Sequence, residues 1–160
     1  MNLEIKYRRA TQNDIIILSE HRVKFINEVF NMATHPDELK LKDELITYFS
    51  KSLKDKSVIA WLALYEDKVI ATSCLVIWHA PMSYAGLQSE GKRGYILNMY
   101  TLGVYRKKGI ASRLLEKLIG EAKKMKLEYV SLHATEDGMR VYKNKGFAPP
   151  KFPELKLKIE

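Results

Sequence analysis

The feature that most constrains the fold is a strand pattern that leads, through a short basic turn, into an amphipathic helix. Residues 95–102, YILNMYTL, form the strand-like run, and the helical pattern extends from residue 110 to about 126. Apolar residues at helical spacing form one stripe of this helix, namely Ile110, Leu114, Leu118, Ala122 and Met125, with Leu115 and Ile119 beside it. We therefore predict that the helix packs on a sheet and begins at the carboxyl end of the strand.

The turn between strand and helix concentrates positive charge at the start of the helix. It contains Arg106, Lys107, Lys108 and Gly109. The first N–H groups of a helix have no intrahelical partner, and the helix dipole adds about half a positive charge there, so this end favours anions. Gly109 allows the backbone to approach a phosphate closely, and Ala111 is small enough to do the same. A single phosphate needs fewer groups, so the pattern favours a pyrophosphate.

Two common phosphate-binding patterns do not occur in the sequence. These are the G-x-x-x-x-G-K-[ST] of P-loop proteins and the G-x-G-x-x-G of dinucleotide-binding folds. The pattern present is Arg106-x-x-Gly109-x-Ala111. This spacing alone is common by chance. It is informative here because it lies between a strand and an amphipathic helix.

The rest of the chain predicts a mixed sheet flanked by helices. Thr11 and Asp14 have the spacing of a capping box at the start of a helix. Besides the junction above, we predict strands at residues 3–9, 58–65, 69–79, 129–134 and 155–160, and helices from residue 12 to about 31, from 37 to 53 and from 136 to 145. The order β-α-α-β-β-β-α-β-α-β combines hairpins with β-α-β crossovers, and it predicts one α/β (α+β) domain over residues 1–160.

Composition limits the classes of function. The net charge of +8 suits a polyanionic partner, such as nucleic acid, an anionic membrane surface or a phosphorylated small molecule, or it reflects a solvated basic surface. No apolar run reaches the roughly 18 residues of a membrane span, and the start MNLEIKYRR is not of signal-peptide type. Cys74 is the only cysteine and excludes an internal disulfide, so we expect a reducing, cytoplasmic setting and no membrane partner.

Two segments resemble the motifs of one family. Arg106-x-x-Gly109-x-Ala111, between a strand and a helix, resembles the acyl-CoA pyrophosphate loop of the GNAT superfamily of N-acetyltransferases. Downstream, VYKNKGF at residues 141–147 resembles the family's L-Y-x-x-x-G-F signature. The predicted element order also matches over nearly the whole chain. The resemblance implies a GNAT-like single domain over residues 1–160.

The resemblance implies an acyl-CoA-dependent N-acetyltransferase, in which a primary amine attacks acetyl-CoA directly in a ternary complex, with no metal. The backbone of Met99, Tyr100 and Thr101 would pair with the pantetheine arm like an added strand. A backbone N–H there would polarise the thioester carbonyl and stabilise the developing oxyanion. The residues implied in pyrophosphate binding are Arg106, Lys107, Lys108, Gly109, Ile110 and Ala111, with Ser112 as an extra donor.

Tyr142 is implied as the general acid that protonates the leaving CoA thiolate. An alkyl thiol has a pKa of about 8.5 and a tyrosine about 10, so transfer from a positioned hydroxyl is modestly uphill in water. The competing interpretation is a core tyrosine on a short helix. At Thr135, family members often have an asparagine that binds the pantetheine, and a threonine can donate a single hydrogen bond there.

The base that removes the proton of the amine is not evident. Family members often have a glutamate early in the strand before the loop, and Tyr95 occupies that place here. The candidates that the sequence offers are Glu28, His79, Glu90 or a water chain. His133 lies in an apolar strand pattern, so we expect a buried core histidine whose ring nitrogens are hydrogen-bonded.

The acceptor, a small amine or a protein amino group, is not specified by any motif. In the family, the first two helices and the loop at residues 80–94 select it, and dimerisation is common. Two other functions are compatible with the sequence. One is a catalytically weak acyl-CoA-binding module, suggested by the missing base. The other is a basic nucleic-acid-binding protein, suggested by the net charge of +8.

Overall fold

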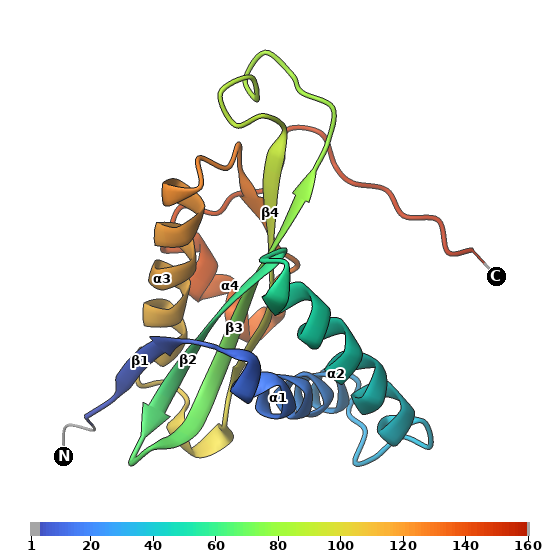
Figure 1. Ribbon diagram of the computed structural model, residues 1–160, viewed down its shortest axis with the longest axis vertical. Helices are drawn as coiled ribbons and strands as arrows, with labels where there is room; N and C mark the ends of the chain where they lie inside the picture. Colours follow the sequence, from blue (N-terminus) through green and yellow to red (C-terminus); the bar gives the residue numbers. More distant parts are fainter. Residues whose placement is uncertain (1–3, 160) are drawn as a thin grey trace.

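Five strands form one mixed sheet in the computed structural model, which describes residues 4–159 (Figure 1). The strands are β1 (Lys6–Arg9), β2 (Val58–Tyr65), β3 (Lys68–His79), β4 (Lys92–Thr101) and β5 (Val130–Ser131). They lie in the order β1-β2-β3-β4-β5, with antiparallel neighbours from β1 to β4 and a parallel pair of β4 and β5. The predicted mixed sheet is thus confirmed.

Helices cover both faces of this sheet, as Figure 1 shows. The helices are α1 (Ile15–Val29), α2 (Glu38–Lys54), α3 (Ile110–Lys124) and α4 (Glu136–Lys143), with short 3-10 turns η1 (Gln12–Asp14) and η2 (Gly103–Tyr105). On the α1 and α2 side, Leu18 and Phe49 pack on Leu62 and Cys74 of the sheet. On the opposite side, Leu115 and Leu118 of α3 pack with sheet residues that include Leu75, Ile77 and Ile96. The sheet therefore separates two apolar layers.

Local sequence signals account for several element ends. The Thr11 side chain accepts from the Asn13 N–H at 3.3 Å, and the Asp14 carboxylate accepts from the Thr11 N–H at 2.7 Å, so the predicted capping box forms. Glu66 and Asp67 separate β2 from β3 in the predicted hairpin, and Lys68, predicted as part of the turn, already belongs to β3. Gly146 follows α4 with φ 90°, a left-handed conformation that is least costly for glycine.

The position of α3 depends on a buried carboxylate that periodicity did not predict. The predicted stripe is buried at Ile110, Leu114, Leu118 and Ala122. Glu121 is also buried, with 2% of its surface exposed. Its carboxylate accepts hydrogen bonds from the Arg9 guanidinium, with Nε at 2.9 Å, and from Trp61 Nε1 at 3.1 Å. This network joins α3 to β1 and β2.

The predicted strand at 155–160 is wrong for the residues that the structure describes. Residues 155–159 are extended but pair with no described strand, and Glu160 lies outside the described part. Pro149, Pro150 and Pro153 precede them, and a proline cannot donate to a strand ladder.

Two other predicted strands are shorter than expected. Of residues 129–134, Val130 and Ser131 alone are assigned to a strand. The first strand is confined to Lys6–Arg9, and Leu3 lies outside the described residues. The loop predicted at residues 80–94 ends sooner than expected, because β4 begins at Lys92.

We expect Glu121→Gln to lower the free energy of unfolding by about 2 kcal/mol at pH 7, because it weakens charge-assisted hydrogen bonds. Burial raises the pKa of Glu121, but the bonds from Arg9 and Trp61 outweigh it and the net shift is downward. The stabilisation is therefore present above the unfolded-state value of 4.5 and is lost as pH falls through the lower folded-state pKa. Urea denaturation at pH 7 and in acid measures both effects.

The matched control is Glu116→Gln on the same helix. Glu116 is exposed and pairs with Arg113 and Lys145 at the surface, where ion pairs contribute little. Equal losses in the two variants would contradict the assigned role of Glu121.

Candidate functional site

A gap opens between β4 and β5 at the carboxyl end of β4. The two strands pair at Gly94 with Val130 and at Tyr95 with Ser131, and no described strand pairs with the same edge of β4 beyond these residues. Met99, Tyr100 and Thr101 lie on this part of β4. An extended ligand can therefore add to the edge as a further strand. One group is already engaged, because the Thr101 carbonyl accepts from Arg106 Nε at 2.9 Å.

A β-bulge interrupts β4 inside this gap. Leu97 pairs with Cys74 and Tyr100 with Thr72, so two residues, Asn98 and Met99, oppose the single residue between Thr72 and Cys74. Asn98 has φ 58°, a left-handed conformation that asparagine tolerates better than most residues. Its side-chain amide donates to the Leu18 carbonyl at 3.2 Å and is 1% exposed. The Asn98 side chain thus attaches the bulge to α1 and does not face the gap.

The loop before α3 presents backbone N–H groups to open space. Lys107 and Gly109 both have left-handed φ, 60° and 77°, a type of turn in which successive N–H groups converge. Gly109 is the N-cap of α3 and no side chain caps the helix. The first helical bond is from the Arg113 N–H to the Gly109 carbonyl at 3.1 Å, which leaves the N–H groups of residues 110–112 available. A Cβ added at Gly109 would meet no atom within 4 Å.

The side chains around this loop have distinct roles. Ile110 is buried, with 2% of its surface exposed, and anchors the start of α3, so that its backbone alone can serve a ligand. Lys107 and Lys108 are exposed and add positive charge. The geometry and charge of the loop therefore fit the predicted pyrophosphate.

Arg106 connects the loop to α1 through Glu28. Its guanidinium donates to the Glu28 carboxylate and lies over the Tyr100 ring, 5.6 Å from the centroid. The Tyr100 hydroxyl donates to Glu28 Oε1 at 2.6 Å. Burial alone would raise the pKa of Glu28, but the bonds from Tyr100 and Arg106 outweigh it and the pKa is lowered. Burial, with Glu28 next in importance, raises the pKa of Tyr100 to about 12.

Tyr142 lies on α4 with its ring half-buried against the α3 layer. Its ring centroid is 6.0 Å from that of Phe147. Burial, and to a lesser extent the Tyr95 phenol, raises the pKa of Tyr142, so the hydroxyl keeps its proton at neutral pH. A Cβ added at Gly138 would come 2.8 Å from Tyr142 Cε2, so Gly138 provides the space for this ring. The Thr135 hydroxyl caps α4 by accepting from the Gly138 N–H at 3.3 Å.

The profile of the Acetyltransferase (GNAT) family matches residues 23–147. The chain belongs to the GNAT acetyltransferase family. A predicted acetyltransferase from Clostridium acetobutylicum, crystallised with acetyl-CoA, is 30% identical, with a TM-score of 0.83 over 95% of this chain and 96% of that one. A GCN5-related N-acetyltransferase from Ralstonia eutropha is 24% identical, with a TM-score of 0.81 over 96% and 98% of the two chains.

Other similarities to GNAT proteins are more distant. An aminoglycoside acetyltransferase from an uncultured soil sample shares the fold at 17% identity, with a TM-score of 0.69 over 98% of this chain and 97% of that one. No curated protein is significantly similar in sequence.

Of the three side chains predicted as candidate bases, the structure brings Glu28 alone to the loop of this GNAT protein. His79 pairs with Lys92 at the far end of β4, and Glu90 precedes that strand. At about 3.3 Å per residue, His79 lies roughly 20 Å along the strand from the bulge at Asn98. His79 and Glu90 are therefore too distant from the bulge to act on a group held there.

A contact between Tyr95 and His133 was not predicted. His133 is exposed, so the expectation of a core histidine is wrong. Its Nδ1 contacts the Tyr95 hydroxyl, and Lys156 Nζ lies 2.9 Å from its Nε2. The sequence feature that could have drawn attention to this contact is Tyr95 itself, because it stands where the family often has a glutamate.

Neither a metal centre nor a membrane span is found in the described part. Within residues 4–159, no three His, Cys, Asp or Glu side chains gather as metal ligands would. None of the helices in this range combines the length and the apolar character that crossing a membrane requires.

We expect Gly109→Glu to weaken acetyl-CoA binding by roughly a hundredfold or more, because its carboxylate projects into the space in front of the helix start. Isothermal titration calorimetry with acetyl-CoA measures the change. The control is Gly120→Glu on the same helix, where an added Cβ also meets no atom within 4 Å. Similar affinities for the two variants would contradict the assignment of the loop.

Proposed function

We propose that this protein is an N-acetyltransferase that transfers an acetyl group from acetyl-CoA to a primary amine, with residues 1–160 as one domain. The observation that carries the proposal is the start of α3 at Gly109, which no side chain caps, beside the part of the β4 edge that no described strand pairs. An extended thioester with a pyrophosphate at one end fits both features, because the pyrophosphate can bind at the start of α3 while the extended part pairs with the edge of β4. A cytoplasmic setting belongs to the proposal, since Cys74 is a free, buried thiol.

The chain offers separate groups to each part of acetyl-CoA. The backbone of Met99, Tyr100 and Thr101 is proposed to bind the pantetheine arm, with a donor at the bulge for the thioester carbonyl. The groups proposed for the pyrophosphate are the N–H groups and charges of Arg106, Lys107, Lys108, Gly109, Ile110, Ala111 and Ser112. The Thr135 hydroxyl caps α4 as an acceptor. Its proton remains available, and we propose that it is donated to the pantetheine arm.

In the proposed reaction, the amine nitrogen attacks the thioester carbon, the C–N bond forms and the C–S bond breaks. The sulfur leaves with the electron pair and takes a proton from Tyr142, which regains one from water. The excess proton of the amine passes to water. Tyr142 is protonated at neutral pH, as a general acid requires, and its raised pKa makes proton transfer to the thiolate more uphill than from a free tyrosine.

We propose Glu28 as the group that attracts the acceptor. It is ionised at neutral pH because its pKa is lowered, and its side chain is 48% exposed. It is adjacent to the residues proposed for acetyl-CoA through Tyr100 and Arg106. A carboxylate at this position favours a cationic amine, since opposite charges attract at close range.

The direct test of the proposed function is incubation of the protein with acetyl-CoA and a panel of primary amines. Release of free thiol together with a mass-identified acetylated amine is the expected result. The alternative is an acyl-CoA-binding module without catalysis, favoured by Tyr95 in place of a carboxylate. It predicts acetyl-CoA binding with no thiol release beyond the uncatalysed rate for any amine.

We expect Tyr142→Phe to lower kcat by roughly a hundredfold, because it removes a positioned acid, and to leave acetyl-CoA affinity within roughly threefold. Steady-state kinetics and calorimetry separate the two effects. The matched control, Tyr129→Phe, removes a hydroxyl from a tyrosine outside the gap. An unchanged kcat for Tyr142→Phe would assign Tyr142 to packing alone.

We expect Glu28→Gln to raise KM for a cationic amine by roughly tenfold, while the KM for acetyl-CoA changes much less. The control is Glu44→Gln, which makes the same charge change on the exposed surface of α2. A KM for the amine that is equal in both variants would contradict a role of Glu28 in acceptor binding.

A further inference from the structure

An arginine on α1 is partly buried and has no carboxylate partner. Within residues 4–159, Arg22 and Arg93 are the two arginines that are partly buried. Arg93 donates to Glu128 at 3.1 Å, whereas no group in this range accepts a hydrogen bond from the Arg22 guanidinium. A guanidinium is always charged, and burying a charge is costly unless it is paired. The environment of Arg22 therefore favours an anion that comes from outside the chain.

The neighbours of Arg22 belong to four different elements. Its guanidinium carbon lies 5.6 Å from the centroid of the Phe25 ring, which is also on α1. Burial lowers the pKa of Arg22, and the groups that oppose this lowering are the Cys74 thiol and the phenols of Tyr95 and Tyr48. These three residues belong to β3, β4 and α2. Arg22 is thus surrounded by aromatic rings and a thiol, on the face of the sheet that α1 and α2 cover.

Arg22 lies one helical turn from the contact that attaches the bulge of β4 to α1. Leu18, four residues earlier, is the residue whose carbonyl accepts from Asn98 at 3.2 Å. Side chains of a helix lean towards its N-terminus, so the Arg22 side chain leans over the turn of Leu18. Cys74 pairs with Leu97, the residue directly before Asn98. The guanidinium is therefore close to the bulge, which is proposed to hold the thioester.

We propose that the acceptor carries a carboxylate in addition to its primary amine, and that Arg22 binds this carboxylate. The inference rests on the proposed function, because it concerns the acceptor of the same reaction. A planar guanidinium donates two parallel hydrogen bonds to a carboxylate, which a neutral group cannot replace at equal strength. The single charge of a carboxylate also matches that of one arginine, whereas a phosphate carries about −1.5 to −2 at pH 7.

Arg22 and Glu28 place opposite charges along the same helix. Glu28, proposed to attract the amine, is six residues further along α1, which corresponds to about 9 Å of helical rise. An acceptor with a cationic amine at one end and a carboxylate at the other matches this arrangement of charges. Arg22 would thus orient the acceptor with its amine directed towards Glu28.

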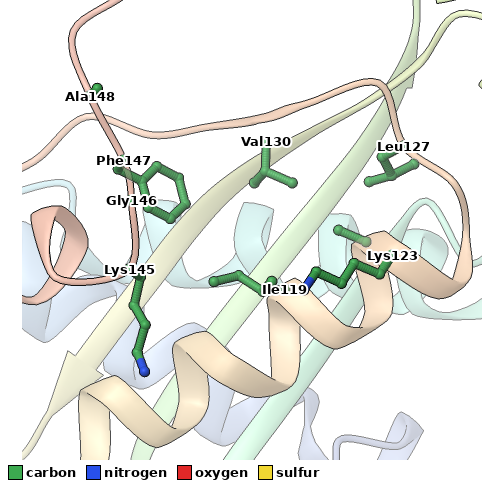
Figure 2. A pocket seen from close by; sticks show the side chains of 9 residues that line it. Ile119, Lys123, Leu127, Val130, Lys145, Gly146, Phe147 and Ala148 are labelled. Carbon is green, nitrogen blue, oxygen red and sulfur yellow. The ribbon is translucent and has the colours of Figure 1, made fainter.

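An apolar cavity elsewhere in the molecule is separate from this site. The cavity, of about 480 Å³, lies between α3 and the segment that follows α4, with Ile119, Val130 and Phe147 in its lining (Figure 2). These three side chains belong to the apolar layer on the α3 side of the sheet. Because α1 covers the opposite face, a substitution at Arg22 leaves this cavity unchanged.

The test compares kcat/KM for ω-amino acids, each against its own carboxamide. In a pair such as δ-aminovalerate and its amide, the carboxylate is lost while the distant amine keeps nearly the same pKa. We expect the carboxylate member to be acetylated roughly tenfold more efficiently or better. Equal efficiencies within every pair overturn the inference and leave the proposed function in place. Acetyl-CoA binding without acetylation of any amine overturns the proposed function, and this inference with it.

A second pair distinguishes a carboxylate from a phosphate. Phosphoethanolamine and ethanolamine differ in a phosphate in the same way. A preference for the charged member that occurs in this pair alone would assign a phosphate to Arg22 and would overturn the choice of a carboxylate.

Variants at Arg22 separate recognition of the carboxylate from a role in packing. Arg22→Gln should lower kcat/KM for the carboxylate member roughly tenfold and leave the carboxamide member within roughly threefold, so that the preference disappears. Arg22→Lys keeps the charge without the planar fork and should retain part of the preference. The control Lys40→Gln removes a charge from the exposed surface of α2 and should keep the full preference. Equal losses for both members in Arg22→Gln would assign Arg22 to packing on Phe25 and contradict the inference.

Discussion

The attachment of α3 to the sheet is the constraint on which the proposed anion site depends. Leu114, Leu115 and Leu118 bury one side of the helix, and the bonds of Glu121 to Arg9 and Trp61 hold its second half against β1 and β2. A helix fixed in this way presents its first N–H groups at a constant place beside β4. Donors that are already oriented need no reorganisation when an anion binds, so the interaction energy is not spent on ordering the loop.

Glu28, Arg106 and Tyr100 form one cluster that connects α1 to the loop before α3. Glu28 belongs to α1, whereas Arg106 precedes α3, and they meet across the Tyr100 ring of β4. An anion near Arg106 would compete with Glu28 for the same guanidinium. Occupation of the loop therefore changes the electrostatic environment of Glu28, because an ion pair that shares its cation weakens. The proposed binding of acetyl-CoA and of the amine would thus be coupled through Arg106.

Local signals predicted much of the architecture, and contacts distant in sequence account for what they missed. The stripe of α3 and the capping box at Thr11 depend on residues within one or two turns, so they are visible in the sequence. The burial of the Glu121 carboxylate depends on its bond from Arg9, which is 112 positions away in the sequence. The bulge at Asn98 breaks the period of two without a glycine to signal it. His133 is exposed just beyond the end of β5, and residues 155–159 pair with no described strand.

We propose that the loop before α3 and the edge of β4 together bind acetyl-CoA. Calorimetric titration of the unmodified protein with acetyl-CoA, and with ATP and NAD for comparison, is the decisive test. We expect saturable binding of one acetyl-CoA per chain, and much weaker binding of ATP and NAD, because neither of them has a pantetheine arm that pairs with β4. No binding of acetyl-CoA, or equal binding of all three ligands, would contradict it.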